Sequence, residues 1–206
     1  KIFAASVNLH QQSIEKEDEV FADTTVQEAN VTYPTDTKMR RKIIEKMWKM
    51  GEEAGVKWSR SYVRTVPKLL ATLRTRSNRM VKNRRKAEKR LKTLGGRLIR
   101  EFRRRASSGW LTVYREDLEL FEKVLKQGRT DKGKIYSLHD PEVLCIAKGK
   151  AHKKYEFGRK ASVVMLAKSG VIVGAKSFKE NLYDGDTLDP ALWQVRRITG
   201  KWPRNC

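Results

Sequence analysis

The sequence is poor in cysteine and histidine, and it has no long apolar run. Its two cysteines, Cys145 and Cys206, lie far apart and match neither a metal-binding spacing nor a disulfide framework, so we expect reduced thiols. The three histidines, His10, His139 and His152, are scattered and form no ligand cluster. No run approaches the roughly 18 apolar residues that a membrane helix needs, so we expect no membrane-spanning segment.

Acidic residues are also scarce compared with basic ones. The 206 residues include 46 Lys and Arg but only 24 Asp and Glu, which gives a formal net charge of +22. The electrostatic field of such a positively charged protein attracts polyanions. We therefore expect nucleic acid as the first candidate partner and an anionic membrane surface as the second. The 39% hydrophobic content is sufficient for a core, so the composition does not indicate a wholly disordered chain.

The positive charge is concentrated in residues 60–105, which contain 18 Lys and Arg but only two acidic residues, Glu88 and Glu101. Apolar positions recur there at steps of three, four or seven residues, which predicts an amphipathic helix with a cationic back. These positions are Met80, Ala87, Leu91, Leu94, Leu98 and Phe102. The pair Gly95-Gly96 predicts a kink or break in this helix.

A one-sided cationic face of this kind favours contact with DNA phosphates and the release of their counterions. A purely solvated face would mix charge signs, and a membrane-surface helix would have a larger apolar face with Trp. The candidate DNA-binding residues on this helix are Arg84, Arg85, Lys86, Lys89, Arg90, Lys92, Arg103 and Arg104.

Two further helices are predicted beside this run, so that residues 36–128 form an all-helical block. Thr35 or Asp36 can cap the N-terminus of the first helix, which ends near Gly55. The second helix ends at Gly128. Their Met-rich and aromatic stripes predict core positions rather than ligand sites. The stripes are Met39, Ile43, Met47, Met50 and Ala54 in the first helix, and Trp110, Tyr114, Leu118, Phe121 and Leu125 in the second.

The second half of the chain changes to β-rich patterns separated by turn residues. Strands are predicted at 135–139, 143–149, 155–167 and 171–178, with a hairpin turn in AKSG. A helix is predicted around 188–199, capped by Thr187 or Asp186 and ended by Gly200. The pattern therefore predicts an α+β fold, in which a strand and a hairpin are separated by an inserted helical subdomain.

The stretch EVFADTTVQ near the start ends an apolar segment on the carboxylate of Asp23. These residues alone favour an aspartate that caps the turn after a strand. A carboxylate at the rigid end of a core strand is also a suitable ligand for Mg²⁺.

Three long phrases resemble the DDE transposases of bacterial insertion sequences, enzymes with a ribonuclease H-like core. They are DTTVQEANVTYPTDTKMRRKI, KIYSLHDPEVLCIAKGKAHKKYEFGRKASVV and GVIVGAKSFKENLYDGDTL. The resemblance implies a core of three antiparallel strands and a helix, interrupted by a large basic insertion. It divides the chain into residues 1–35 with the first strand, the insertion 36–130, and a hairpin region with a helix in 131–206.

The resemblance makes Asp23 the first catalytic carboxylate and a ligand of Mg²⁺, for which Mn²⁺ can substitute. The family's second Asp follows the position of ITGKWPRN in an Asp-x-Gly-Tyr phrase, and its Glu lies further on. We therefore expect a fragment, truncated at both ends, that holds one third of the triad and is inactive alone. Asp184 and Asp186 are interpreted as a turn and helix cap, with a metal or DNA contact as the alternative.

The implied partners are duplex DNA at transposon ends and targets, and further copies of the full-length protein. No small-molecule substrate is implied, and the implied location is the bacterial cytoplasm at the nucleoid. Two alternatives stay open: a non-catalytic DNA-binding protein and a basic RNA-binding protein. The RNA-binding alternative lacks aromatic RNA-binding signatures.

A second basic group surrounds the glycine-containing turn of AKGKAHKKYEFGRK. It could contact phosphates or form an ordinary basic hairpin, and the sequence does not separate these. Its candidate DNA-binding residues are Lys148, Lys150, Lys153 and Lys154. Gly158 predicts a bulge or a close backbone approach. Trp48, Trp58 and Trp193 could stack on bases, but their surroundings favour the core or an interface.

Overall fold

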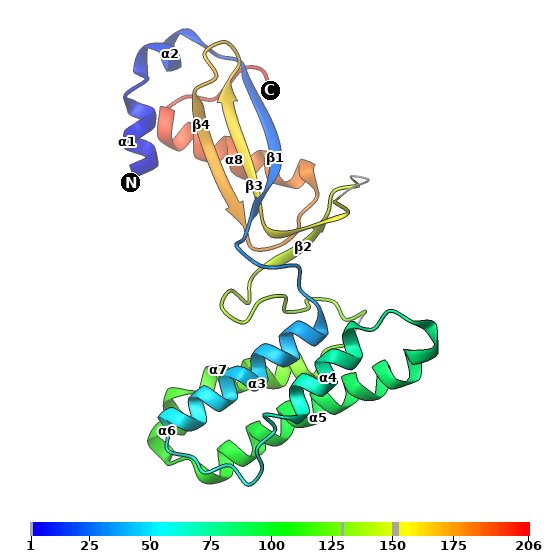
Figure 1. Ribbon diagram of the computed structural model, residues 1–206. Helices are drawn as coiled ribbons and strands as arrows, with labels where there is room; N and C mark the ends of the chain where they lie inside the picture. The colour runs from blue at the N-terminus through cyan, green and yellow to red at the C-terminus, as the bar shows by residue number, and fades with distance from the viewer. Residues whose placement is uncertain (1, 129, 150–152) are drawn as a thin grey trace. The chain divides into compact units, whose positions relative to one another are not determined.

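A computed structural model describes residues 2–128, 130–149 and 153–206 (Figure 1). It is an α+β structure with about 51% helix and one open antiparallel sheet of four strands. The chain forms two compact units: unit 1 contains Lys1–Val31 and Glu142–Cys206, and unit 2 contains Thr32–Pro141. Unit 2 is thus an insertion between the first strand of unit 1 and the rest of it.

The sheet of unit 1 is built around one long central strand, β3 (Tyr155–Leu166). β3 pairs antiparallel with β1 (Val20–Glu28), with β2 (Leu144–Ala147) and with β4 (Ile172–Phe178). The predicted turn between the last two strands is confirmed, and its Gly170 has a φ of +67°. The chain returns to β1 near its C-terminus, where Glu19 and Asn205 form a parallel bridge.

The strand predicted at residues 135–139 is wrong, because this segment belongs to the core of unit 2. Leu138 is buried there, and Ile135 packs against the same apolar cluster. The side chain of Gln127 forms the two backbone hydrogen bonds of Ile135 that a neighbouring strand would otherwise form. Its Oε1 accepts from the Ile135 amide at 3.1 Å, and its Nε2 donates to the Ile135 carbonyl at 3.2 Å. The apolar residues of segment 135–139 therefore pack against the helices of unit 2 and do not form part of a sheet.

Three helices cover a single face of the sheet in unit 1. They are α1 (Ile2–Asn8), α2 (Gln11–Lys16) and α8 (Asp184–Thr199), and α8 crosses the strands obliquely in Figure 1. The shared core contains Val7, Ile14, Val20, Val164, Leu166, Val173, Ala191 and Val195. Side chains on the other face of the sheet, including Phe21 and Met165, are exposed.

Helix α8 begins earlier than predicted. Tyr183 is its N-cap, and the predicted cap Thr187 lies inside the first turn, where its hydroxyl donates to the Asp184 carbonyl. The capping roles assigned to Thr187 and Asp186 are therefore wrong. The predicted end at Gly200 is confirmed by its left-handed conformation, with a φ of +80°.

Among its described residues, unit 2 contains helices and loops and no strand. Its elements are α3 (Asp36–Glu53), α4 (Thr65–Arg74), the 3-10 turn η1 (Asn78–Met80), α5 (Val81–Arg105), α6 (Ser108–Val113) and α7 (Arg115–Lys126). The Thr35 hydroxyl caps α3 by accepting from the Lys38 amide, as predicted. The single helix predicted over 110–128 is interrupted at Tyr114.

The predicted apolar stripes meet in one core within unit 2. Its fully buried members include Ile43, Met47, Leu91, Leu94, Leu98, Phe102 and Phe121. The predicted break at Gly95-Gly96 is wrong, since α5 continues through both residues. A Cβ on Gly95 would lie 3.2 Å from Cδ1 of Leu125, so this glycine lets α7 approach α5 closely.

A buried carboxylate joins α5 to the loop after α3. Glu101 is only 7% exposed, and its Oε1 accepts from the Ser59 amide at 2.6 Å. The same oxygen forms an ion pair with Arg105, whose Nε lies 3.2 Å away. Burial raises the pKa of Glu101, but the Ser59 hydrogen bonds and the Arg105 charge outweigh it and leave that pKa below its usual value.

We expect Glu101→Gln to lower the free energy of unfolding of unit 2 by about 1–2 kcal/mol, because the charged acceptor is lost. The matched control is Glu88→Gln on the same helix, where no hydrogen bond is lost among the described residues. Hydrogen exchange of the α5 amides in urea measures the difference. Equal exchange in the two variants would contradict this role for Glu101.

Candidate nucleic-acid interface

The outward side of α5 carries a long row of unpaired cations. Val81–Arg105 contains twelve Lys and Arg but only two Glu, and the apolar stripe turns most of these cations outward. We call the following exposed residues the α5 cationic face: Lys82, Arg85, Lys86, Lys89, Arg90, Lys92, Arg97, Arg100 and Arg104. None of them forms an ion pair with a carboxylate in the part of the chain that the structure describes.

The α5 cationic face has the length and charge of a phosphate-binding surface. At a rise of 1.5 Å per residue, Lys82 and Arg104 lie about 33 Å apart along the helix, close to one turn of B-form DNA. Three of its members, Lys82, Arg97 and Arg100, were not among the sequence-predicted contacts. Their position opposite the apolar stripe is the signal that could have identified them.

Two of the predicted DNA-binding residues are engaged within the protein. Arg84 Nη1 donates to the carbonyls of Thr75 and Ser77 at 2.8 and 2.7 Å, which holds the turn between α4 and α5. Arg103 pairs with Glu122 of α7 at 3.1 Å. Arg84 is therefore a structural residue, and Arg103 is partly neutralised.

Two members of the basic hairpin group, Lys153 and Lys154, contact other side chains of unit 1. Lys153 forms an ion pair with Glu28, and Lys154 Nζ lies 5.6 Å from the centroid of the Tyr155 ring. The Lys148 amide bonds the Lys154 carbonyl across the turn. Lys150 lies outside the described residues.

Asp23 lies within a strand rather than at its end. It is the fourth residue of β1, is exposed, and stands opposite Val163 of β3. The prediction that Asp23 terminates the strand is therefore wrong, because pairing with β3 continues to Glu28. Its Oδ1 accepts from the Thr24 amide at 2.8 Å.

The structure brings no complete set of metal ligands to Asp23. Within residues 2–128, 130–149 and 153–206, no group of three or more His, Cys, Asp or Glu is placed to hold a metal ion. One carboxylate does not make a Mg²⁺ site, since the ion needs further oxygen ligands at fixed positions. The described residues therefore do not fit a complete catalytic metal centre.

Asp184 at the start of α8 forms an ion pair with Lys160 of β3, which connects the helix to the sheet. The Nζ of Lys160, a residue only 8% exposed, contacts the Asp184 carboxylate and the Leu182 carbonyl. Thr24 Oγ1 donates to Asp184 Oδ1 at 2.8 Å. Hydrogen bonds from Lys160 and then Thr24 hold the pKa of Asp184 below its usual value. This partnership replaces the turn-cap role predicted for Asp184.

The Asp184 ion pair predicts a defined pH effect on stability. Because the pKa is lower in the folded chain, ionised Asp184 stabilises unit 1 above pH of about 4, and the effect is lost as pH falls through the folded-state pKa. We expect Asp184→Asn to destabilise unit 1 by about 1 kcal/mol at neutral pH, a value discounted for the exposure of the carboxylate. The deficit should vanish in acid.

Hydrogen exchange of β1 and β3 amides at several pH values measures the Asp184 effect. Asp186→Asn is the matched control on the same helix turn, because Asp186 forms no ion pair among the described residues. A deficit in Asp184→Asn that stays constant from neutral pH down to about pH 3 would contradict the assignment.

No protein-family model, curated protein or solved structure matches the chain. Among the described residues, no helix is long and apolar enough to cross a membrane. The function proposed below is therefore based on the chemistry of the exposed residues.

Proposed function

We propose that this chain binds duplex DNA through the α5 cationic face and is part of a DDE transposase. The observation that carries the proposal is the row of exposed cations on α5 without carboxylate partners in the described chain. Cations that are not neutralised internally can replace the counterions of a phosphate backbone. Contacts to phosphates carry no sequence information themselves, so the contact is expected to be largely independent of sequence.

The transposase part of the proposal is supported by the three resembling phrases and by the order of elements in unit 1. Three antiparallel strands, β1, β3 and β4, are followed by α8, and the chain then returns parallel to β1 at Glu19 and Asn205. Under this proposal Asp23 contributes one carboxylate to a Mg²⁺ site whose other ligands lie outside the described residues.

The duplex-binding function predicts a steep dependence on salt. With six or more phosphate contacts, raising the salt from about 50 to about 200 mM should weaken binding by about 10³-fold or more. Two unrelated duplexes of about 30 base pairs should bind with similar affinity, measured by fluorescence anisotropy. An affinity that is unchanged by salt would contradict the proposal, and tighter binding to RNA at equal salt would favour an RNA partner.

A second candidate function is DNA binding without catalysis, and the incomplete ligand set around Asp23 favours it for this chain alone. We expect no nicking of supercoiled plasmid with Mg²⁺ or Mn²⁺. Nicking that is abolished by Asp23→Asn would contradict this expectation, since it would show an active site completed by other groups.

A further inference from the structure

Two exposed tryptophans and an arginine gather at the C-terminal end of α8. Trp193 is 58% exposed and Trp202 is 42% exposed, and their rings meet edge to face with centroids 5.0 Å apart. The Arg196 guanidinium lies 5.3 Å from one ring centroid and 5.1 Å from the other. The sequence favoured a core or interface position for Trp193, and its exposure to solvent excludes the core position.

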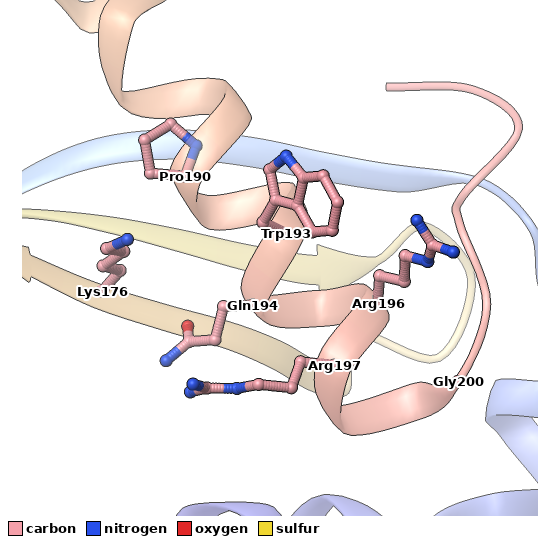
Figure 2. A pocket seen from close by; sticks show the side chains of 7 residues that line it. All are labelled: Lys176, Pro190, Trp193, Gln194, Arg196, Arg197 and Gly200. Atoms are coloured by element: carbon pink, nitrogen blue, oxygen red, sulfur yellow. The ribbon is translucent and has the colours of Figure 1, made fainter.

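Trp193 forms one wall of a pocket of about 500 Å³ (Figure 2). Lys176 of β4 and Arg197 of α8 also line it, and Pro190 and Gly200 complete the lining with Arg196 and Gln194. The Gln194 side chain is fixed, because its Oε1 accepts from the Ala175 amide at the edge of β4 at 2.8 Å. The pocket walls are therefore tied together by a hydrogen bond between helix and strand.

The positive charge of the pocket lining favours an anionic ligand. No acidic residue lines it, and neither Lys176, Arg196 nor Arg197 forms an ion pair with a carboxylate in the described parts of the chain. An exposed indole beside such cations suits a ligand that combines a flat aromatic ring with a negative charge. A nucleotide has both features, and pockets of this volume accept small ligands.

We propose that this pocket binds an unpaired nucleotide of single-stranded DNA, with the base stacked on Trp193 and its phosphates held by Lys176 and Arg197. In a duplex, both faces of each base are covered by its neighbours, so only an unstacked base can reach the indole. Arg196 stacks on the two tryptophans and positions Trp193. This site lies in unit 1, so it goes beyond the duplex contact of α5 and does not depend on it.

The test compares two labelled single strands of about 12 nucleotides, one an oligothymidylate and the other carrying abasic residues at its central positions. Both carry the same phosphates, so the α5 cationic face contributes equally to both affinities. We expect the full chain to bind the oligothymidylate roughly five- to a hundredfold more tightly. Equal binding of the two strands would overturn the proposal.

Three variants locate the effect. In Trp193→Ala the preference for bases should fall to within about twofold, whereas Trp193→Phe should keep most of it. Tyr183→Ala is the control, because Tyr183 is an even more exposed aromatic at the other end of α8, outside the pocket. A preference that survives Trp193→Ala would overturn the assignment. Since Trp193 is exposed, far-UV circular dichroism and the thermal midpoint of unfolding should show that the fold is retained.

Two competitors identify the source of the ligand. Thymidine monophosphate should compete much more weakly than the oligothymidylate, and equal competition would overturn the assignment to a strand. An acidic tryptophan-containing peptide that binds more tightly than the oligothymidylate, and only when Trp193 is present, would assign the pocket to a protein partner instead. A failure of any of these tests leaves the salt-dependent duplex binding of α5 unchanged, so the two proposals fail separately.

Discussion

Replacing Arg85, Lys86, Lys89 and Lys92 with glutamine is expected to weaken duplex DNA binding by about 10²- to 10⁴-fold at 0.1 M salt. Each of the four side chains is exposed on α5 and lacks a carboxylate partner among the described residues. Each lost phosphate contact also removes about 0.9 from the slope of log affinity against log salt. Glutamine has a helix propensity close to that of lysine and arginine, so α5 should persist.

The matched control removes the same charge from elsewhere on the surface. Lys16, Lys132, Lys168 and Lys179 are exposed and lie outside α5, so their replacement by glutamine gives the same net charge. We expect this variant to lose less than about tenfold in affinity, because only the long-range field is reduced. Equal losses in the two variants would show that binding follows net charge rather than the α5 cationic face.

Gly158→Ala is expected to be the most damaging single substitution in unit 1. Gly158 lies where β3 pairs with both β1 and β2, opposite Glu28 and Leu144. An added Cβ would overlap the Gln27 carbonyl oxygen and lie 2.8 Å from its carbon, and both atoms belong to the backbone. Because the strands must separate to admit it, we expect a loss of about 3 kcal/mol or more.

Hydrogen exchange of the β1 and β3 amides measures the Gly158→Ala effect. Gly109→Ala in α6 is the control, since a Cβ at Gly109 meets no atom within 4 Å and alanine favours the helix. We expect the control to be neutral or slightly stabilising. Unchanged β1 exchange in Gly158→Ala would mean that the strands pair differently from the structure described above.

The helices of unit 2 could be predicted from the sequence because their signal is local. Apolar residues at helical steps define α3 and α5, and a Thr35 cap marks where the first of them begins. The close approach at Gly158 was also expected, since a glycine inside a strand favours such contacts. The helix signals depend on residues that are near one another in the chain, and the Gly158 signal lies in the glycine itself.

The errors arise where residues of different helices, strands or loops meet. Arg84 looks like any other cation of α5 until the Thr75 and Ser77 carbonyls are placed beside it. Residues 135–139 have the composition of a strand, but Gln127 and the helical core provide their partners. The start of α8 at Asp184 likewise accompanies an ion pair with Lys160, a residue 24 positions earlier in the chain. Local patterns contain none of these contacts.

The most direct test of the central claim is lysine footprinting of the unmodified chain. Acetylation is measured by mass spectrometry with and without duplex DNA at low salt. We predict that DNA protects Lys82, Lys86, Lys89 and Lys92 of α5, while Lys16, Lys132, Lys168 and Lys179 keep their reactivity. Equal protection of the two groups, or protection of the second group alone, would contradict the assignment of DNA binding to the α5 cationic face.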